Sequence, residues 1–247
     1  MEYFSNELIL FFVGCIAGFL NVFAGGGSAL TLPALIFAGL DTATANGTNR
    51  IVLILQNISG ISSFKKQKVS GMRIALKYAV FTIPGAITGA FFSIQITHEW
   101  FERILAVIMI GIIISMFKKQ KTPQDINYEN KKPGPFFYLS MFLIGFYGGF
   151  IQVGVGFILM AALFHFLQTS LMRVNYYKLI IVLVYMVPAM LVFLFHNKIN
   201  WTLGLVTALG NMIGAWIAAR ANVEKGDKFI RYILSVALLI IAIKLFL

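Results

Sequence analysis

The chain alternates between long apolar stretches and short polar segments. Residues 8–40 and residues 134–168 contain no Lys, Arg, Asp or Glu at all. Shorter apolar stretches follow each of these two, at 51–64, 78–97 and 104–117 after the first and at 179–195, 199–219 and 232–247 after the second. Apolar runs of about 20 residues are typical of helices that cross a bilayer. The pattern predicts an all-α integral membrane protein.

One long stretch followed by three shorter ones occurs twice, which indicates an internal duplication of roughly 125–130 residues. We expect a first transmembrane repeat at 1–118, a cytoplasmic linker at 119–133 and a second repeat at 134–247. Two glycine patterns recur in the same order, Gly14-xxx-Gly18 with Gly145-xxx-Gly149, and Gly85-xxx-Gly89 with Gly210-xxx-Gly214. At this spacing, small residues let helices pack closely.

Each long stretch is predicted to be a broken hairpin. Residues 8–40 as one straight helix would be about 50 Å long, whereas the hydrocarbon core is about 30 Å thick. The run Gly25-Gly26-Gly27 interrupts the first stretch, and Gly154 and Gly156 interrupt the second. Each glycine in a helix interior costs about 1 kcal/mol. We therefore expect two short helices with an unwound tip in each stretch, a helical hairpin followed by three spans.

The distribution of basic residues favours the hairpins. With hairpins, 16 of the 20 Lys and Arg residues fall on the side of residues 65–77, and four fall on the other side. With single crossings the split becomes 12 to eight. Cytoplasmic loops are enriched in Lys and Arg. Both termini are then extracytoplasmic, and the two repeats have inverted topology, an arrangement typical of transporters with broken helices at the midplane.

Composition agrees with a membrane protein. Hydrophobic residues make up 59% of the chain, charged residues 12%, and the mean hydropathy is +0.86. Soluble domains carry about 25% charged residues. The net charge of +11 fits cytoplasmic loops on an anionic leaflet better than nucleic-acid binding. The single cysteine, Cys15, allows no intrachain disulfide.

The two hairpin tips are candidate substrate sites. Unwound backbone at membrane depth survives only where it lines a cavity or is buried in protein. The free N–H groups at the start of the following half-helix favour anions, and Ser28 is expected to cap it. A packing hinge without a ligand is the alternative. The candidate residues are Asn21, Gly25, Gly26, Gly27 and Ser28 in the first tip and Gln152, Gly154 and Gly156 in the second.

Polar residues also open the span that follows each hairpin. Asn and Thr suit helix N-caps, and a cation beside helix N-termini suits an anion pathway. Capping combined with cations that extend to the interface is the alternative. The candidates are Asn46, Thr48, Asn49 and Arg50 in the first repeat and Asn175, Tyr176, Tyr177 and Lys178 in the second.

His165 is the one ionisable residue deep in a long apolar stretch. A proton relay is one interpretation, and a neutral histidine that donates to a backbone carbonyl is the other. All nine acidic residues fall in loops or at the termini. A cation in the spans would therefore find no carboxylate, which favours an anion as the substrate. No phosphate-binding loop or metal-ligand motif is present, and we expect no cofactor.

These residues resemble the TauE/SafE sulfite exporter family of membrane transporters. The resemblance rests on Gly14-xxx-Gly18, on Gly25-Gly26-Gly27 with Pro33 after it, and on Ala45-Asn46-Gly47-Thr48. It extends over nearly the whole chain. It implies export or uptake of sulfite, sulfonates or related small organic anions.

The sequence therefore predicts a secondary transporter that moves a small anion across the bacterial plasma membrane by alternating access. The alternatives are an anion channel with the same site, and an intramembrane enzyme or assembly factor. The expected partners are the lipid bilayer and the anion, without nucleic acid. Assembly into a homo-oligomer stays open.

Overall fold

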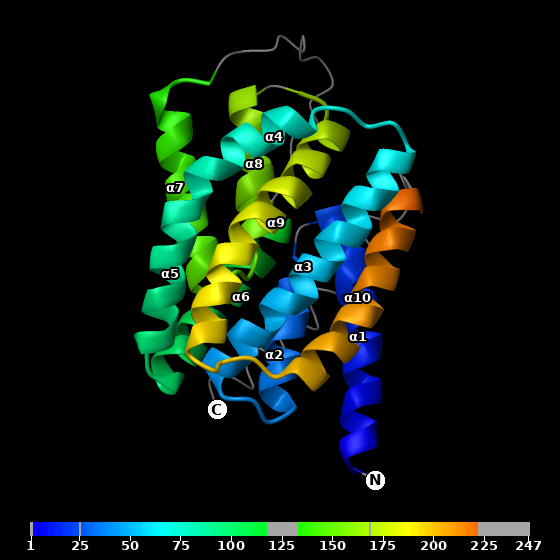
Figure 1. The fold of residues 1–247 in the computed structure, drawn as a ribbon, viewed down its shortest axis with the longest axis vertical. Coiled ribbons are helices and arrows are strands. Elements are labelled where there is room, and N and C mark those ends of the chain that lie inside the picture. The colour runs from blue at the N-terminus through cyan, green and yellow to red at the C-terminus, as the bar shows by residue number, and fades with distance from the viewer. Residues whose placement is uncertain (1, 25, 118–132, 168, 222–247) are drawn as a thin grey trace.

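The computed structural model describes residues 2–24, 26–117, 133–167 and 169–221. These residues form helices and no strand, so the all-α prediction is confirmed for them (Figure 1). Residues 119–132 of the expected linker 119–133, and the last expected span, 232–247, lie outside the described residues. In chain order the elements are α1 (Glu2–Ala24), α2 (Ser28–Phe37), α3 (Thr42–Lys66), α4 (Met72–Ala79), η1 (Val80–Thr82), α5 (Ile83–Gln95), α6 (His98–Phe117), α7 (Pro135–Phe150), α8 (Val155–Leu167), α9 (Leu171–Phe195) and α10 (Trp201–Ala221).

Both long apolar stretches are broken, as predicted. α1 remains helical through Ala24 and α2 begins at Ser28, so among the described residues the first break comprises Gly26 and Gly27. The second break runs from Ile151 to Gly154, because α8 begins at Val155. The predicted tips at 21–28 and 152–156 are therefore too wide. At about 1.5 Å per residue, α2 is about 15 Å long and α8 about 20 Å, and both are shorter than a bilayer core of about 30 Å.

The helices α3 and α9 begin earlier than their apolar stretches suggest. Asp41 caps α3 by accepting a hydrogen bond from the Thr44 backbone N–H at 3.1 Å. Ser170 caps α9 through the Arg173 backbone N–H at 3.4 Å. The prediction that Asn46–Arg50 and Asn175–Lys178 supply helix N-caps is thus wrong. Both segments lie inside a helix, because Asp and Ser occupy the true caps.

The glycine patterns pack against one another across the two halves of the chain. A Cβ placed on Gly18 of α1 would meet the backbone of Asn211 of α10, and one on Gly214 would meet the backbone of Cys15. In the same way, Gly89 of α5 lies against Phe146 of α7, and Gly149 of α7 lies against Ala86. The close-packing role expected of these glycines is confirmed.

The two halves of the chain are therefore interlocked. α1 lies beside α10, and α5 lies beside α7 (Figure 1). α3 packs against both α9 and α10. Each helix of these pairs comes from a different half, so neither half buries its apolar surface alone.

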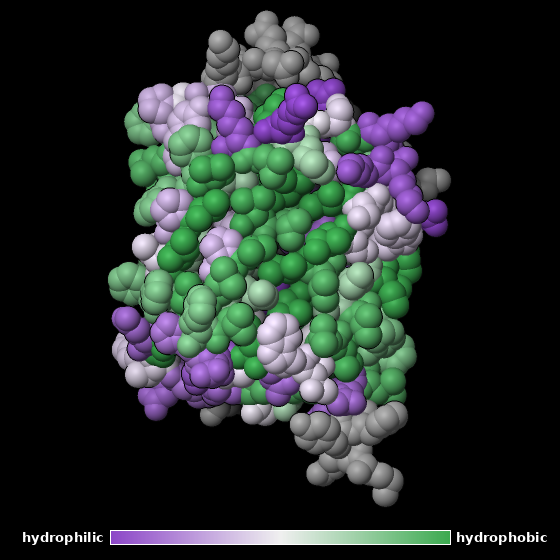
Figure 2. Space-filling model, in the orientation of Figure 1, coloured by the Kyte–Doolittle hydropathy of each residue, from purple (hydrophilic) through white to green (hydrophobic). Residues whose placement is uncertain are grey.

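The outer surface is that of a membrane protein. On the face shown in Figure 2, apolar residues cover a broad band across the middle, and hydrophilic residues gather at the two ends. Several large apolar side chains are more than half exposed, among them Phe12, Ile16 and Ile217. Three described helical segments are long and apolar enough to cross a bilayer, Met72–Gln95, Met172–Phe195 and Trp201–Arg220. Surface of this extent is stable in lipid, not in water.

Candidate functional site

The two helix breaks meet inside the protein. Ser28, the first residue of α2, donates a hydrogen bond from Oγ to the carbonyl oxygen of Gln152 at 3.3 Å. Ser28 and Gln152 are both buried. The expected cap is absent, because Gly27 precedes α2 and no side chain caps it. Ser28 therefore joins the two tips and does not close its own helix.

The second break has an unusual backbone that its neighbours hold in place. Gln152 adopts a φ of 65°, a left-handed conformation that is rare for residues other than glycine. Its side-chain Oε1 accepts a hydrogen bond from the Tyr185 hydroxyl at 3.0 Å. The Tyr147 hydroxyl donates to the carbonyl oxygen of Val153. These two tyrosines fix the loop from α9 and from α7.

Arg50 and Asn46 of α3 bind the last turn of α7. The Arg50 guanidinium donates to the carbonyl oxygens of Gly148 and Gly149, at 2.6 Å each. The Asn46 side-chain amide donates to the Phe150 carbonyl oxygen at 2.7 Å. Arg50 is fully buried. These bonds satisfy carbonyl groups that every helix end leaves without a partner.

Lys178 and Asn175 of α9 do the same for the end of α1. The Lys178 Nζ donates to the carbonyl oxygen of Asn21 at 2.9 Å. The Asn175 side-chain amide donates to the Val22 carbonyl oxygen at 2.6 Å. Lys178 is 2% exposed. An amide and a cation from one half of the chain thus close the broken helix of the other half, in both directions.

We call the residues around the two helix breaks, with Asn46, Arg50, Asn175 and Lys178, the centre. The positions of its two cations differ from those that the sequence predicts. The cations were expected beside helix N-termini, and they lie at helix C-termini, where the backbone dipole favours positive charge. Arg50 and Lys178 are also buried side chains of α3 and α9 and do not lie in loops. If both are left out of the count that the hairpin topology predicts, 15 basic residues remain on one expected side and three on the other, so the predicted bias is kept.

The remaining expected residues divide into two groups. The Asn21 amide donates to Gln56 Oε1 at 2.8 Å, and Asn49 Oδ1 accepts from the Thr31 hydroxyl at 2.6 Å, so both belong to the centre. Thr48 instead accepts from the Asn200 backbone N–H at 2.9 Å. Three further residues have other neighbours or positions: Tyr176 lies beside Phe64, Tyr177 lies beside Gly71, and Gly156 lies in the first turn of α8.

His165 has other neighbours than the residues at the two helix breaks. His165 lies in the last turn of α8 with an exposed side chain, and its ring contacts Phe166. Gly25 lies outside the described residues. No group of three or more His, Cys, Asp or Glu side chains that could hold a metal occurs within the described ranges.

Sequence reasoning missed a polar face on α3. Gln56 and Asn57 are fully buried, and Ser63 is 1% exposed. They lie in a stretch that reads as apolar, 51–64, and their spacing of six to seven residues was the available signal. Ser93 of α5, which accepts from the Asn46 amide at 2.7 Å, was missed as well.

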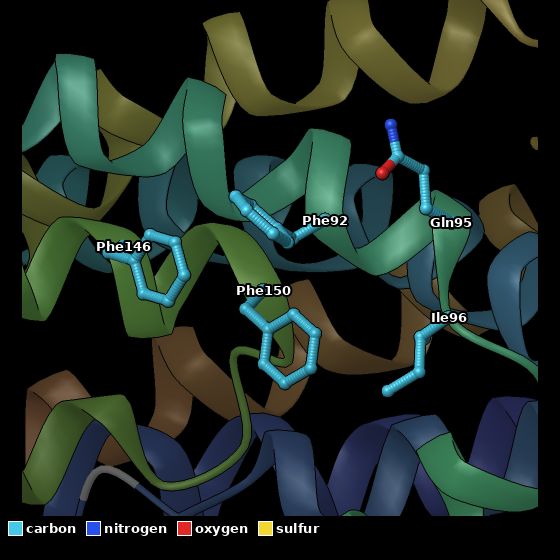
Figure 3. A pocket seen from close by; sticks show the side chains of 5 residues that line it. All are labelled: Phe92, Gln95, Ile96, Phe146 and Phe150. Atoms are coloured by element: carbon cyan, nitrogen blue, oxygen red, sulfur yellow. The ribbon is translucent and has the colours of Figure 1, made fainter.

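A hollow on the outer side of α5 and α7 is a poor candidate for an anion. It is lined by Phe92, Gln95, Ile96, Phe146 and Phe150. Figure 3 shows the three phenylalanine rings around a common space, with the Gln95 amide directed away from them. No cation lines this hollow. Its chemistry suits apolar groups.

Comparison with known proteins gives one consistent result. The family described as Sulfite exporter TauE/SafE matches residues 10–245. The chain is 27% identical to the Probable membrane transporter protein YfcA of Escherichia coli over 96% of its own length and 88% of that protein's. It is 27% identical to the Probable membrane transporter protein ORF9 of Sinorhizobium, covering 96% and 90%. The Probable membrane transporter protein YunE of Bacillus subtilis is 26% identical, covering 96% of each. No solved structure matches the chain.

Proposed function

We propose, from the premise that the chain belongs to the TauE/SafE sulfite exporter family of membrane transporters, that it carries a small oxyanion such as sulfite or a short sulfonate across the bacterial plasma membrane. The substrate would bind where the two helix breaks meet. The relatives are bacterial proteins named as membrane transporters. Transport therefore has stronger support than an intramembrane enzyme.

The observation that carries the anion assignment is a pair of buried cations without a buried acid. Arg50 and Lys178 are almost completely excluded from solvent, and no Asp or Glu is buried among the described residues. Taking an ion out of water costs several kcal/mol in real proteins. A helix C-terminus returns at most about 2 kcal/mol. A bound anion would supply the negative charge that no buried Asp or Glu of the described residues provides.

The reciprocal contacts support two inverted repeats. In the first half, Asn46 and Arg50 lie one turn apart on the helix that follows the hairpin. In the second half, Asn175 and Lys178 occupy the corresponding turn of α9. In Figure 1, α1 ascends from the end where the N-terminus lies, and α7 descends from the opposite end. A pseudo-two-fold axis in the membrane plane, as in other transporters with broken helices, would relate the two.

An alternating-access carrier follows from this symmetry. Each tip contacts both halves, so a movement of one half against the other would open the centre to one side at a time. A channel with the same site would not couple the two openings. The hydrophilic end that carries residues 65–77 would be cytoplasmic, in accord with the positive-inside bias.

The test is flux in proteoliposomes that contain the purified protein. Labelled sulfite should enter only vesicles with protein, an excess of a short alkanesulfonate should compete, and choline should not. Unlabelled sulfite on the opposite side should accelerate exchange, which distinguishes a carrier from a channel. Absence of sulfite and sulfonate flux in protein that is correctly folded would refute the anion assignment.

A further inference from the structure

One face of α3 carries buried polar side chains in which at least one polar atom has no hydrogen-bond partner. Asn49, Gln56 and Ser63 follow one another at intervals of seven residues, and Arg50 and Asn57 lie beside them. All five are at most 1% exposed. Each keeps at least one buried polar atom without a hydrogen bond: Asn49 Nδ2, Arg50 Nε, Gln56 Nε2, both side-chain polar atoms of Asn57, and Ser63 Oγ.

These unpartnered atoms destabilise the folded protein, and helix packing gives no reason for them. A buried donor or acceptor without a partner costs about 1–3 kcal/mol, and native proteins contain only a few per hundred residues. Here several lie along one helix face. Asn211 of α10, the helix packed against α3, adds two more unpartnered atoms.

The unpartnered groups are mostly hydrogen-bond donors. Asn49 already accepts a hydrogen bond at Oδ1 from Thr31, and Gln56 accepts one at Oε1 from Asn21. Their free groups are therefore the NH₂ groups. The free Nε of Arg50 is also a donor. Donors in this number suit an oxyanion that has lost its water, whereas a cation would find few acceptors.

The polar face of α3 extends from the centre to the end of the helix that carries Lys65 and Lys66. Asn49 and Arg50 belong to the centre where the helix breaks meet. Ser63 lies in the turn before Lys65 and Lys66, the last residues of α3. Lys65 and Lys66 would raise the local concentration of an anion at this end of α3. α3 rises from the centre to this end of the molecule in Figure 1.

We propose that the face of α3 from Asn49 to Ser63 lines the half of the pathway between the buried cations and the Lys65–Lys66 end, and that it conducts a desolvated oxyanion along its amide and hydroxyl donors. The proposal rests on anion transport as the function. It adds Gln56, Asn57 and Ser63 to the substrate contacts. In the present structure these side chains are buried, so the path opens only when α10 or α9, the helices packed against α3, separates from it.

Cysteine labelling tests the proposal without any knowledge of the substrate. The single natural cysteine is replaced as Cys15→Ala, and Gln56→Cys, Asn57→Cys and Ser63→Cys are made in that background. Ile58→Cys is the matched control, because Ile58 is apolar, 43% exposed and next to Asn57 in the chain. The probes are two membrane-impermeant methanethiosulfonates, one with a sulfonate group and one with a trimethylammonium group.

The sulfonate reagent should modify all three path positions from the side of residues 65–77, at least about tenfold faster than the cationic reagent after each rate is divided by that for a free thiol, a factor equal to 1.4 kcal/mol. Ile58→Cys should react with neither. Protection of Gln56→Cys and Asn57→Cys from both reagents in folded protein would overturn the proposal, as would equal rates for the two reagents. Labelling as expected without sulfite flux would leave the path intact and refute only the substrate.

Discussion

The Nζ atom of Lys178 on α9 lies 2.9 Å from the carbonyl oxygen of Asn21 at the end of α1. The Arg50 guanidinium makes the corresponding contact with the end of α7. A broken helix in each half is thus closed by a cation from the other half. The charges that would attract an anion and the bonds that hold the tips in place belong to the same two side chains.

The first prediction separates charge from geometry at Arg50. Arg50→Lys keeps the positive charge, but an ammonium group lacks the planar fork that reaches the Gly148 and Gly149 carbonyls together. We expect a loss of about 1–3 kcal/mol in stability from an orphaned carbonyl, with measurable sulfite flux retained. Arg50→Gln should lose stability and flux together. Thermal unfolding in detergent and proteoliposome flux measure the two effects. Equal flux in Arg50→Lys and Arg50→Gln would contradict the role of the charge.

The second prediction concerns the glycine contacts. Gly149→Ala places a methyl group against the backbone of Ala86. Overpacking of this kind costs typically about 1–3 kcal/mol, so the melting temperature should fall. Gly111→Ala is the matched control, because a Cβ on Gly111 of α6 meets nothing within 4 Å. That variant should be neutral, or more stable by up to about 1 kcal/mol through helix propensity. Similar melting temperatures for both variants would argue against close packing of α5 on α7.

The third prediction opposes stability to function at Asn57. Asn57→Leu removes two buried unpartnered atoms from the face of α3. The protein should become more stable by about 1–3 kcal/mol, the cost of such groups, and sulfite flux should fall. Ile58→Leu on the exposed side should change neither quantity. Unchanged flux in Asn57→Leu would show that the residue lies outside the pathway.

The fourth prediction fixes sidedness. In the Cys15→Ala background, Ser70→Cys and Thr97→Cys place exposed thiols at opposite ends of the α4–α5 segment. An impermeant maleimide should label Thr97→Cys in intact cells and Ser70→Cys only after the membrane is opened. Labelling of both positions from the same side would contradict the topology deduced from the basic residues.

Much of the fold could be predicted from the sequence, because lipid imposes a strict length and polarity on each span. The breaks near Gly25–Gly27 and Gly154 follow from stretches too long for a bilayer and from the glycines within them. The starts of α3 and α9 could not be placed from apolar length, since Asp41 and Ser170 begin each helix well before the apolar run. Hydropathy records burial in lipid and is insensitive to a polar helix turn buried in protein.

The residues of the candidate site could be predicted from the sequence, but their hydrogen-bond partners could not. Asn46, Arg50, Asn175 and Lys178 are visible as polar residues at repeated positions. Their partners are backbone carbonyls of the other half, more than ninety residues away in the chain, and no local pattern reports such a pairing. Gln56 and Asn57 were not predicted, because two amides in an otherwise apolar run have little effect on its average hydropathy.

The most direct test of the central claim is calorimetric titration of sulfite and a short alkanesulfonate into the purified wild-type protein, Arg50→Gln and Lys178→Gln. The account predicts binding to the wild type, with affinity reduced at least about tenfold in each variant, equal to 1.4 kcal/mol, in samples that remain monodisperse. It also predicts no binding of choline. Unchanged sulfite affinity in both variants, or tight binding of choline to the wild type, would contradict an anion site built on the two buried cations.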